Sequence, residues 1–521
     1  MSSAPPPPPP LAPLFSRSRL RVKEIIELPN QGEELVDTDV VVCGWSRTVR
    51  EAQKGTLAFI ELTDGSCQGN LQVVCNKETT SGFEEVVSAG GTGASFKVKG
   101  TLIASPAKGQ KVELKANEVI VLGNIDQNEY PLKKTGKKSA GHSVEFLRDV
   151  AHLRARTNLF GAVARVRNAC AQAVHQFYNE RGFLYVHTPL ITGSDCEGAG
   201  EMFAVTTLLS AAEKNGGQLP LVDEATAKKF ATDEKPPKIG DVNYKSDFFG
   251  RPTFLTVSGQ LNVETYACGL SDVYTFGPTF RAENSNTSRH LAEFWMIEPE
   301  LSFATLEDDI NLAEDFLKFV THYVLENCSN DIDFFDARVE KGLRERLHNV
   351  LATPFQRLTY TEAIDILLDP EHLKAGKFEV KPHWGIDLGS EHERYLSEVV
   401  YKKPVVLTDY PADIKAFYMR QNELDSEGRL TVQAMDILVP RIGEIIGGSA
   451  REERLDKLES RIEAMGLEKE DFSWYCDLRR FGTVPHAGFG LGFERLIMFV
   501  TGVNNIRDTI PFPRYPKTCN F

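Results

Sequence analysis

The sequence predicts an α+β protein in which a small closed β-barrel precedes a larger domain built on an antiparallel sheet flanked by helices. Residues 39–123 alternate apolar and polar side chains in five short runs separated by turn residues, as strands of a small barrel do. Beyond residue 151, strand runs and helical periods occur in separate blocks, which is typical of α+β folds. The chain of 521 residues is too long for one compact core.

Residues 1–37 are expected to be a disordered, Pro-rich tail and lead-in. The run Pro5–Pro10 favours polyproline II, and no apolar core of a secretory signal is present. The Ser and Arg content weakly resembles a transit peptide, but the prolines oppose the amphipathic helix that such a peptide needs. The nine cysteines are scattered without a CxxC pair, which suits a reducing compartment. We therefore expect a cytoplasmic protein, with a mitochondrion or another organelle as the alternative.

Residues 38–126 are predicted to form a five-stranded barrel of the OB type, with a plain β-sandwich as the alternative. A net charge of −14 is unlike that of proteins that coat nucleic acids without sequence preference, although it is compatible with recognition of a specific RNA. No apolar run approaches the roughly 20 residues that span a bilayer, so no membrane contact is expected.

A polar, basic segment at 127–150 is predicted to be a hinge, and residues 151–521 to be the second domain. Helix spacing connects the apolar positions from Val163 to Phe177, and Gly182 is placed to end that helix. Residues 206–250 are polar and lack periodicity, so we interpret them as an insertion or a mobile loop.

The segment 280–294, FRAENSNTSRHLAEF, is unusually rich in charge for a stretch beside an apolar strand. Arg281 and Arg289 flank a turn-forming sequence, so a hairpin would let both guanidinium groups reach one ligand. Guanidinium groups suit phosphate oxygens, and Phe294 on the returning strand offers a ring on which a base stacks. No GxxxxGK[ST] loop is present, so the phosphates would not sit in a P-loop.

Two further patterns are compatible with a phosphate ligand. In GFGLGFERL the alternating glycines clear one face of a strand, and Arg495 falls in the first turn of the following helix, where a cation is normally disfavoured. Asp436 and Glu444 lie on neighbouring strand segments and suit Mg²⁺ bound through phosphate oxygens and water. The alternative for this pair is two ordinary surface acids.

Taken together, these strings resemble the class II aminoacyl-tRNA synthetases. FRAENSNTSRHLAEF resembles motif 2, PHAGFGLGFERL resembles motif 3, and the segment from Gly182 to Pro189 resembles motif 1, an element of the dimer interface. The barrel together with SGQL, FERL and FPR resembles subclass IIb, which charges aspartate, asparagine and lysine. The resemblance covers about residues 38–521, interrupted at 206–250.

Within the subclass, LTVSGQLNVE, DLRRFGTVPHAGFGLGFERL and IRDTIPFPRYP resemble the asparagine-specific enzymes most closely. Aspartate-specific members carry a lysine two residues after SxQL, where this chain has Val263 followed by Glu264. A carboxylate there accepts a hydrogen bond from the amide NH₂ of asparagine and repels the carboxylate of aspartate. A site built around such a hydrogen-bonded group discriminates by about 10⁴–10⁵.

The resemblance implies that L-asparagine and ATP form asparaginyl-adenylate and that the acyl group then passes to tRNA(Asn), with Mg²⁺ as cofactor and a homodimer as the assembly. Arg281 and Arg495 are the implied catalytic residues. The implied sites are, for ATP, Arg281, Glu283, Arg289, His290, Phe294 and Arg495; for Mg²⁺, Asp436 and Glu444; for asparagine, Glu197, Ser258, Gln260, Glu264 and Arg480, with Arg479 as an alternative to Arg480; and for the anticodon, Phe59, Gln72 and Arg47.

Three other functions remain open at the level of sequence. An aspartate-charging enzyme of relaxed specificity is disfavoured by the missing lysine. A synthetase-like asparagine synthetase would lack the anticodon barrel. A catalytically inactive relative that only binds RNA would not need all four of Arg281, Arg289, Phe294 and Arg495. For Phe59, a place in the barrel core is the alternative to RNA stacking.

Overall fold

The computed structural model describes residues 15–107, 109–133, 142–194, 202–233 and 235–521. The chain divides into two compact units, residues 1–165 and residues 166–521. The division falls inside helix α5 (Asn158–Glu180), later in the chain than the predicted start of the second domain at 151.

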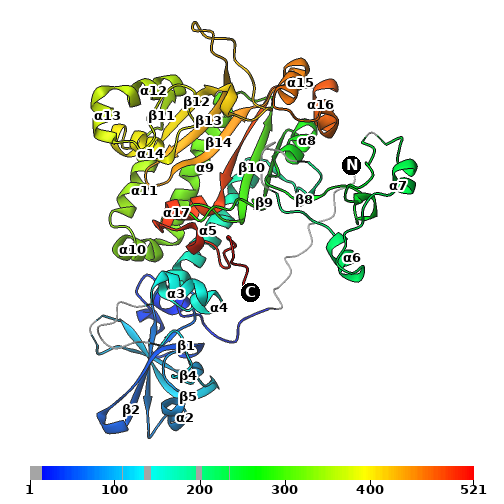
Figure 1. Cartoon of the computed structure of the whole chain (residues 1–521). Coiled ribbons are helices and arrows are strands. Elements are labelled where there is room, and N and C mark those ends of the chain that lie inside the picture. The colour runs from blue at the N-terminus through cyan, green and yellow to red at the C-terminus, as the bar shows by residue number, and fades with distance from the viewer. Residues whose placement is uncertain (1–14, 108, 134–141, 195–201, 234) are drawn as a thin grey trace, which may run out of the picture. The chain divides into compact units, whose positions relative to one another are not determined.

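The first unit contains a closed five-stranded barrel of strand order β1-β2-β3-β5-β4, which confirms the predicted OB-type fold (Figure 1). Its elements are β1 (Asp39–Ala52), β2 (Leu57–Thr63), β3 (Leu71–Asn76), α2 (Phe83–Ser88), β4 (Ser95–Ala104) and β5 (Val112–Gly123). Strand alternation fixes the faces: Ala58, Ile60 and Leu62 of β2 are fully buried in the barrel core. Phe59 and Glu61 therefore face outward.

The prediction that residues 1–37 are disordered is wrong from Leu20 onward. The Leu20 N–H donates to the carbonyl oxygen of Val41 at 2.9 Å, and the short helix α1 (Lys23–Ile26) follows. Val22 and Ile25 are buried in the barrel core, so apolar burial holds this segment in place. The polyproline run lies outside the described residues.

The predicted hinge is in part a structured connection. Helices α3 (Val144–Asp149) and α4 (Ala151–Arg154) precede α5, and Tyr130 and Leu132 pack with Leu147 and Phe160 in a small apolar cluster. Ser143 caps α3 by accepting a hydrogen bond from the Phe146 N–H at 3.2 Å.

The second unit is built on an eight-stranded sheet of order β11-β12-β13-β14-β15-β10-β9-β6 (Figure 1). All pairs are antiparallel except β11 with β12 and β6 with β9, which confirms the expected mainly antiparallel sheet. The strands are β6 (Leu184–Tyr185), β9 (Asp272–Phe280), β10 (Glu293–Ser302), β11 (Gln356–Thr359), β12 (Val405–Pro411), β13 (Thr431–Val439), β14 (Gly443–Ala450) and β15 (His486–Gly492).

Helices flank this sheet. The long helix α9 (Leu306–Asn327) begins with a capping box between Thr305 and Asp308 and packs its apolar stripe across β13, β14 and β15. The other helices are α8 (Gln260–Leu270), α10 (Ser329–Arg338), α11 (Leu343–Ala352), α12 (Tyr360–Leu368), α13 (Pro370–Gly376), α14 (Ser390–Arg394), α15 (Leu455–Ala464), α16 (Ser473–Arg480) and α17 (Phe493–Thr501).

The segment 206–250 is locally folded rather than a structureless loop. It contains α6 (Leu208–Lys214) and α7 (Glu224–Lys229) and is flanked by the paired strands β7 (Ile191–Thr192) and β8 (Phe254–Leu255). The Asp247 carboxylate joins the two ends of the insertion, because it accepts hydrogen bonds from the Thr206 hydroxyl at 2.6 Å and the Thr207 N–H at 2.8 Å.

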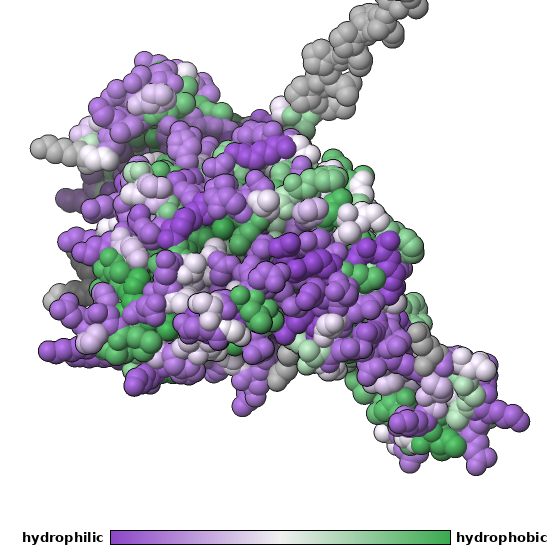
Figure 2. All heavy atoms as spheres, turned by 90° about the horizontal axis from the view of Figure 1, so that it is seen from above, coloured by the Kyte–Doolittle hydropathy of each residue, from purple (hydrophilic) through white to green (hydrophobic). Residues whose placement is uncertain are grey.

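The surface is predominantly hydrophilic on the face that Figure 2 shows, with small hydrophobic groups between the polar ones. Among the described residues, no helix has the length and apolar character needed to cross a membrane.

Candidate active site

The segment 280–294 forms the predicted hairpin. Strands β9 and β10 pair in the register Phe280 with Glu293, and the Arg281 N–H continues the ladder to the Ala292 carbonyl at 3.0 Å. A residue from another part of the chain holds the tip of the hairpin, because the Ile506 N–H donates to the Ser288 carbonyl at 2.9 Å. The backbone that carries the charged side chains is therefore fixed at both its base and its tip.

One cavity of about 180 Å³ collects the charged side chains of the hairpin and of α17. Its walls include all six residues predicted to bind ATP, which are Arg281, Glu283, Arg289, His290, Phe294 and Arg495. The guanidinium carbon of Arg281 lies 5.4 Å from the centre of the Phe294 ring. The structure thus brings Arg281 and Arg289 of the hairpin loop and Arg495 of α17 to one space.

Two of the three alternating glycines shape this cavity. Gly490 and Gly492 line it, and a Cβ on Gly490 would lie 2.9 Å from the end of the Met296 side chain. Gly488 serves packing instead, since a Cβ there would meet the Pro299 carbonyl at 2.4 Å and the Glu300 carboxylate at 2.5 Å.

The electrostatics of the cavity favour an anion. Burial lowers the pKa of Arg289, and the positive charges of Arg394 and Arg495 lower it further. No hydrogen bond or ion pair with another described residue engages the Arg289 guanidinium. A polyanion between these arginines would relieve their mutual repulsion.

Asp436 and Glu444 converge beside this cavity, as expected for a cation site. A Cβ built on Gly447 would lie 3.1 Å from Glu444 Oε1 and 3.3 Å from Asp436 Oδ1, so the two oxygens share one small space above a glycine. Asp436 also pairs with Lys415 at 2.7 Å. Within the described residues no third His, Cys, Asp or Glu completes a metal-ligand cluster. Two carboxylates fit a Mg²⁺ ion whose remaining ligands are phosphate oxygens and water.

Glu264 lies at the centre of a buried hydrogen-bond cluster. Its carboxylate, which is fully buried, accepts hydrogen bonds from Arg479 Nη2 at 2.8 Å and from the Tyr475 hydroxyl at 2.7 Å, and His486 Nε2 lies 2.8 Å away. Burial raises the pKa of Glu264, but Arg479 and His486 outweigh that effect and hold it well below its ordinary range. The carboxylate is therefore ionised at neutral pH.

The structure corrects the choice between the two neighbouring arginines of α16. Arg480, the predicted asparagine ligand, points outward and pairs with Asp477 at 2.9 Å and Glu459 at 3.0 Å. Arg479, the alternative, is the buried partner of Glu264. Adjacent residues of a helix point about 100° apart, and only the packing of α16 decides which one faces inward.

Gln260 carries an unusual unpaired group. Its amide Nε2 is buried and has no hydrogen-bond partner among the described residues, a costly state unless a ligand accepts from it. Ser258 differs, because its hydroxyl already donates to the Glu298 carboxylate, which also accepts from the Gly259 N–H at 3.0 Å. Glu197 lies outside the described residues.

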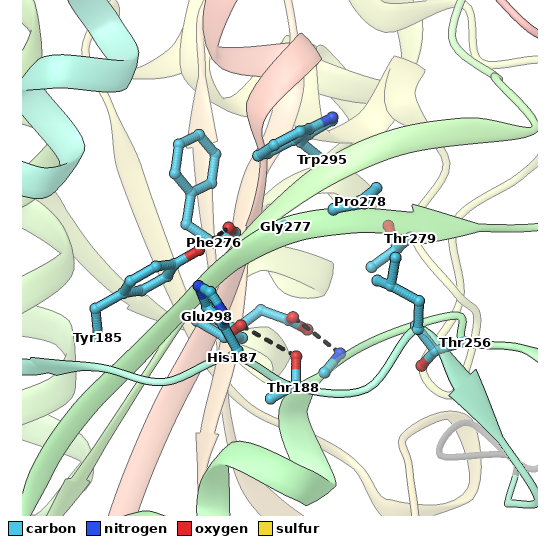
Figure 3. Close-up of a pocket in the computed structure, with 13 residues that line it drawn as sticks. Tyr185, His187, Thr188, Thr256, Phe276, Gly277, Pro278, Thr279, Trp295 and Glu298 are labelled. Carbon is cyan, nitrogen blue, oxygen red and sulfur yellow. Dashed lines mark hydrogen bonds between the residues drawn. The ribbon is translucent and has the colours of Figure 1, made fainter.

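A further cavity, of about 240 Å³, borders the Ser258–Gln260 segment at Gly259 (Figure 3). Tyr185, His187 and Thr188 from the segment after α5 face Trp295 and Pro278 across it. Glu298 and Gly259 both line this cavity, so the carboxylate that accepts from the Gly259 N–H also borders it.

The outer face of the barrel carries a shallow cavity of about 620 Å³. Phe59 and Gln72 line it as predicted, and the guanidinium of Arg50 lies 5.1 Å from the centre of the Phe59 ring. The alternative of Phe59 as a core residue is wrong. Arg47 does not line this cavity: its guanidinium donates to the Arg156 carbonyl, and burial lowers its pKa. Arg50 occupies the position expected for Arg47.

Comparisons with known proteins agree with these features. The family "tRNA synthetases class II (D, K and N)" matches residues 143–215 and 220–516, and "OB-fold nucleic acid binding domain" matches residues 40–122. The asparagine–tRNA ligase of Treponema denticola is 55% identical over 502 residues, which cover 96% of this chain and 99% of the relative. The chain belongs to the asparagine–tRNA ligase family.

The chloroplastic and mitochondrial asparagine–tRNA ligase of Arabidopsis thaliana is 53% identical over 97% of this chain and 84% of the relative.

Solved structures of asparaginyl-tRNA synthetases share the whole architecture. The enzyme of Pyrococcus horikoshii, complexed with asparaginyl-adenylate, superposes with a TM-score of 0.77 at 30% identity, over 96% of this chain and 99% of that one. The Entamoeba histolytica enzyme in complex with asparaginyl-adenylate has a TM-score of 0.73 at 27% identity, over 93% of this chain and 97% of that one. The predicted fold and the predicted asparagine-specific synthetase family are thereby confirmed.

Three residues of this asparagine–tRNA ligase site were not singled out from the sequence. Tyr475 and His486 complete the donors around Glu264, and Glu298 anchors the Ser258–Gln260 turn. The position of His486 as the first residue of the glycine-rich strand β15 is the one available signal, because a polar residue that begins a buried strand needs a partner.

Proposed function

We propose that this asparagine–tRNA ligase binds ATP in the cavity of Arg281, Arg289 and Arg495, selects L-asparagine with Glu264 and Arg479, and charges tRNA(Asn). The observation that carries the proposal is the meeting of three guanidinium groups in one cavity, two from the β9–β10 hairpin and one from α17. A purely structural role would pair each of them with a carboxylate, whereas Arg289 has no such partner among the described residues.

In the first step Arg281 contacts the α-phosphate and neutralises the charge that develops there. The asparagine carboxylate oxygen attacks the α-phosphorus, the bond to the bridging oxygen of the β-phosphate breaks, and pyrophosphate leaves. Arg289 and His290 hold the leaving phosphates, while Phe294 and Arg495 hold the two faces of the adenine. No side chain forms a covalent intermediate, so positioning and charge neutralisation account for the rate.

Asp436 and Glu444 are the residues that would hold Mg²⁺ in this account. Their oxygens converge above Gly447, beside the arginines that face the phosphates. A bound Mg²⁺ ion would neutralise phosphate charge and orient the phosphate oxygens.

Selection of asparagine rests on the ionised Glu264. Its carboxylate accepts from the side-chain NH₂ of asparagine, while Arg479 donates to the side-chain carbonyl oxygen. Aspartate would place a second negative charge against the buried carboxylate, which is unfavourable in a site of low dielectric. The unpaired amide of Gln260 is available to the amino acid as well. The contribution of Glu197 remains a prediction from the sequence.

In the second step a hydroxyl of the terminal adenosine of tRNA(Asn) attacks the acyl carbon of the adenylate, and AMP leaves. The barrel would read the anticodon, with a base stacked on Phe59 and hydrogen-bonded to Gln72, and with Arg50 beside the ring. Gln72 Nε2 donates to Glu113 at 3.1 Å, which leaves the amide oxygen of Gln72 toward a base.

The enzyme is proposed to act as a homodimer. Leu184, Tyr185, Leu190 and Ile191 follow α5 and are each about 40–50% exposed, an unusual density of exposed apolar side chains for one short segment. The overlapping segment from Gly182 to Pro189 resembles motif 1 in sequence. Analytical ultracentrifugation should give a mass near twice the chain's 58.1 kDa. A cytoplasmic location stays a prediction from the sequence.

The test of the proposed function is exchange of labelled pyrophosphate into ATP, measured with each of the twenty amino acids and without RNA. Asparagine alone should support rapid exchange. Equal exchange with aspartate would indicate the relaxed enzyme instead, and no exchange with any amino acid would contradict the proposal.

A further inference from the structure

We propose that a second arginine-rich cavity, next to the ATP cavity, is a subsite for pyrophosphate after it has left the nucleotide. The cavity holds about 190 Å³ and is walled by Arg289, Arg394 and Arg441. The inference rests on the proposed function and adds a place for the leaving group. Linear polyphosphate is the class of ligand that it would take.

Arg289 is the shared wall of the two cavities. In the proposed mechanism the phosphate chain of ATP runs from Arg281 toward Arg289. The second cavity therefore begins where the triphosphate ends. Pyrophosphate that is no longer bonded to the α-phosphorus can move past Arg289 without crossing the amino-acid site.

The charges around the second cavity do not cancel. Arg394 pairs with Glu398 at 3.0 Å, and Arg441 lies 3.7 Å from Glu340 and donates to Asn504 at 3.1 Å. Arg289 brings a positive charge that no described carboxylate balances through an ion pair.

Glu340 also forms an ion pair with a second arginine, Arg346. Both of its oxygens accept from Arg346, at 2.9 Å each, so it neutralises Arg441 only in part. Among the described residues that line this cavity or pair with its lining, the four guanidinium groups of Arg289, Arg346, Arg394 and Arg441 outnumber the two carboxylates of Glu340 and Glu398 by two. Glu393 also acts on Arg289, but burial raises the pKa of its carboxyl to about 8, which favours its neutral form.

The exposure of the outer arginines suits a transient ligand. The side chains of Arg394 and Arg441 are 42% and 45% exposed, so water screens their attraction for an anion and binding stays weak. A weak site beside a strong one helps a multiply charged product to leave. Arg289 connects the two, because Arg394 and Arg495 act on it from opposite cavities.

The test compares the KM for pyrophosphate with the KM for ATP in asparagine-dependent exchange of labelled pyrophosphate into ATP. Arg441→Ala and Arg394→Ala should each raise the KM for pyrophosphate about three- to ten-fold and leave the KM for ATP within about two-fold, since each removes one charge-assisted contact to pyrophosphate alone. Glu398→Gln should act in the opposite direction and lower the KM for pyrophosphate, because the excess positive charge increases. Arg357→Ala is the matched control. The Arg357 side chain is 38% exposed, much like those of Arg394 and Arg441, but it pairs with Glu307 and Glu314 and does not line the cavity.

The outcomes separate the subsite from the proposed function. If the unaltered protein shows no asparagine-dependent exchange, the proposed function itself fails. If it exchanges normally and the double variant Arg394→Ala/Arg441→Ala keeps an unchanged KM for pyrophosphate, the subsite alone is refuted. A rise of the KM for ATP equal to that for pyrophosphate would also overturn the subsite. Melting temperatures show whether each variant is folded, and Glu398→Gln, which keeps the side-chain shape, tests the inference independently of the arginine variants.

Discussion

Replacement of Glu264 by glutamine tests how this enzyme selects asparagine. The substitution keeps the shape of a fully buried side chain and removes its charge. It leaves the buried guanidinium of Arg479 without its counter-charge and weakens the contacts from Tyr475 and His486. The arginines that we propose to bind ATP line a separate cavity, so the change should act on asparagine more than on ATP.

The expected magnitude follows from the contact that asparagine loses. A hydrogen bond to a charged group contributes about 1.5–3 kcal/mol, so the KM for asparagine should rise about 10- to 150-fold. The KM for ATP should stay within about two-fold, because no hydrogen bond among the described residues links the Glu264 cluster to the cavity of Arg281, Arg289 and Arg495. Discrimination against aspartate should also fall, since the repelling charge is gone.

The assay is pyrophosphate exchange at varied asparagine, aspartate and ATP, with Glu459→Gln as the control. Glu459 pairs with the outward-facing Arg480, and its replacement should change none of the three KM values. An equal loss for asparagine and ATP in Glu264→Gln would refute the proposed contact, as would unchanged discrimination against aspartate.

The remaining predictions concern ATP, RNA and stability. Arg281→Ala should lower exchange at least about 10²-fold, because it removes a charge that acts at the reacting phosphorus, while tRNA binding in a filter assay stays intact. Phe59→Ala should weaken tRNA(Asn) binding by about 1–3 kcal/mol in the same filter assay and leave RNA-independent exchange unchanged, since it removes one stacking platform. Arg167→Ala should lower the free energy of unfolding in urea by about 3–5 kcal/mol, because Arg167 pairs at 2.7 Å with the buried Glu494. Arg167→Lys should recover part of that loss; equal stability of both variants and the parent would contradict the role of the pair.

The convergence of the side chains proposed to bind the nucleotide was largely predictable from the sequence. Arg281 and Arg289 both lie in the connection of one hairpin, whose strands pair up to Phe280 and Glu293, and this leaves few arrangements other than convergence. The role of Arg495 could be predicted from its position in the first turn of a helix. A cation is disfavoured there unless an anion lies nearby. Spacing along the chain was therefore enough to predict which side chains share a cavity where the contacts were local or belonged to a known motif.

Packing decided the rest. Arg479 and Arg480 are adjacent, and the sequence cannot say which of them the turn of α16 buries. The prediction of Arg47 failed because its contact with the Arg156 carbonyl, which depends on packing, directs it away from the outer cavity that Arg50 lines. Burial of Val22 against the barrel depends on a contact distant in sequence, which local composition does not reveal.

The most direct test of the central claim is a crystal structure of the enzyme with asparagine and a non-hydrolysable ATP analogue. The account predicts one nucleotide whose phosphates contact Arg281 and Arg289, with adenine between Phe294 and Arg495. A nucleotide bound elsewhere, or phosphates that touch none of these guanidinium groups, would contradict it.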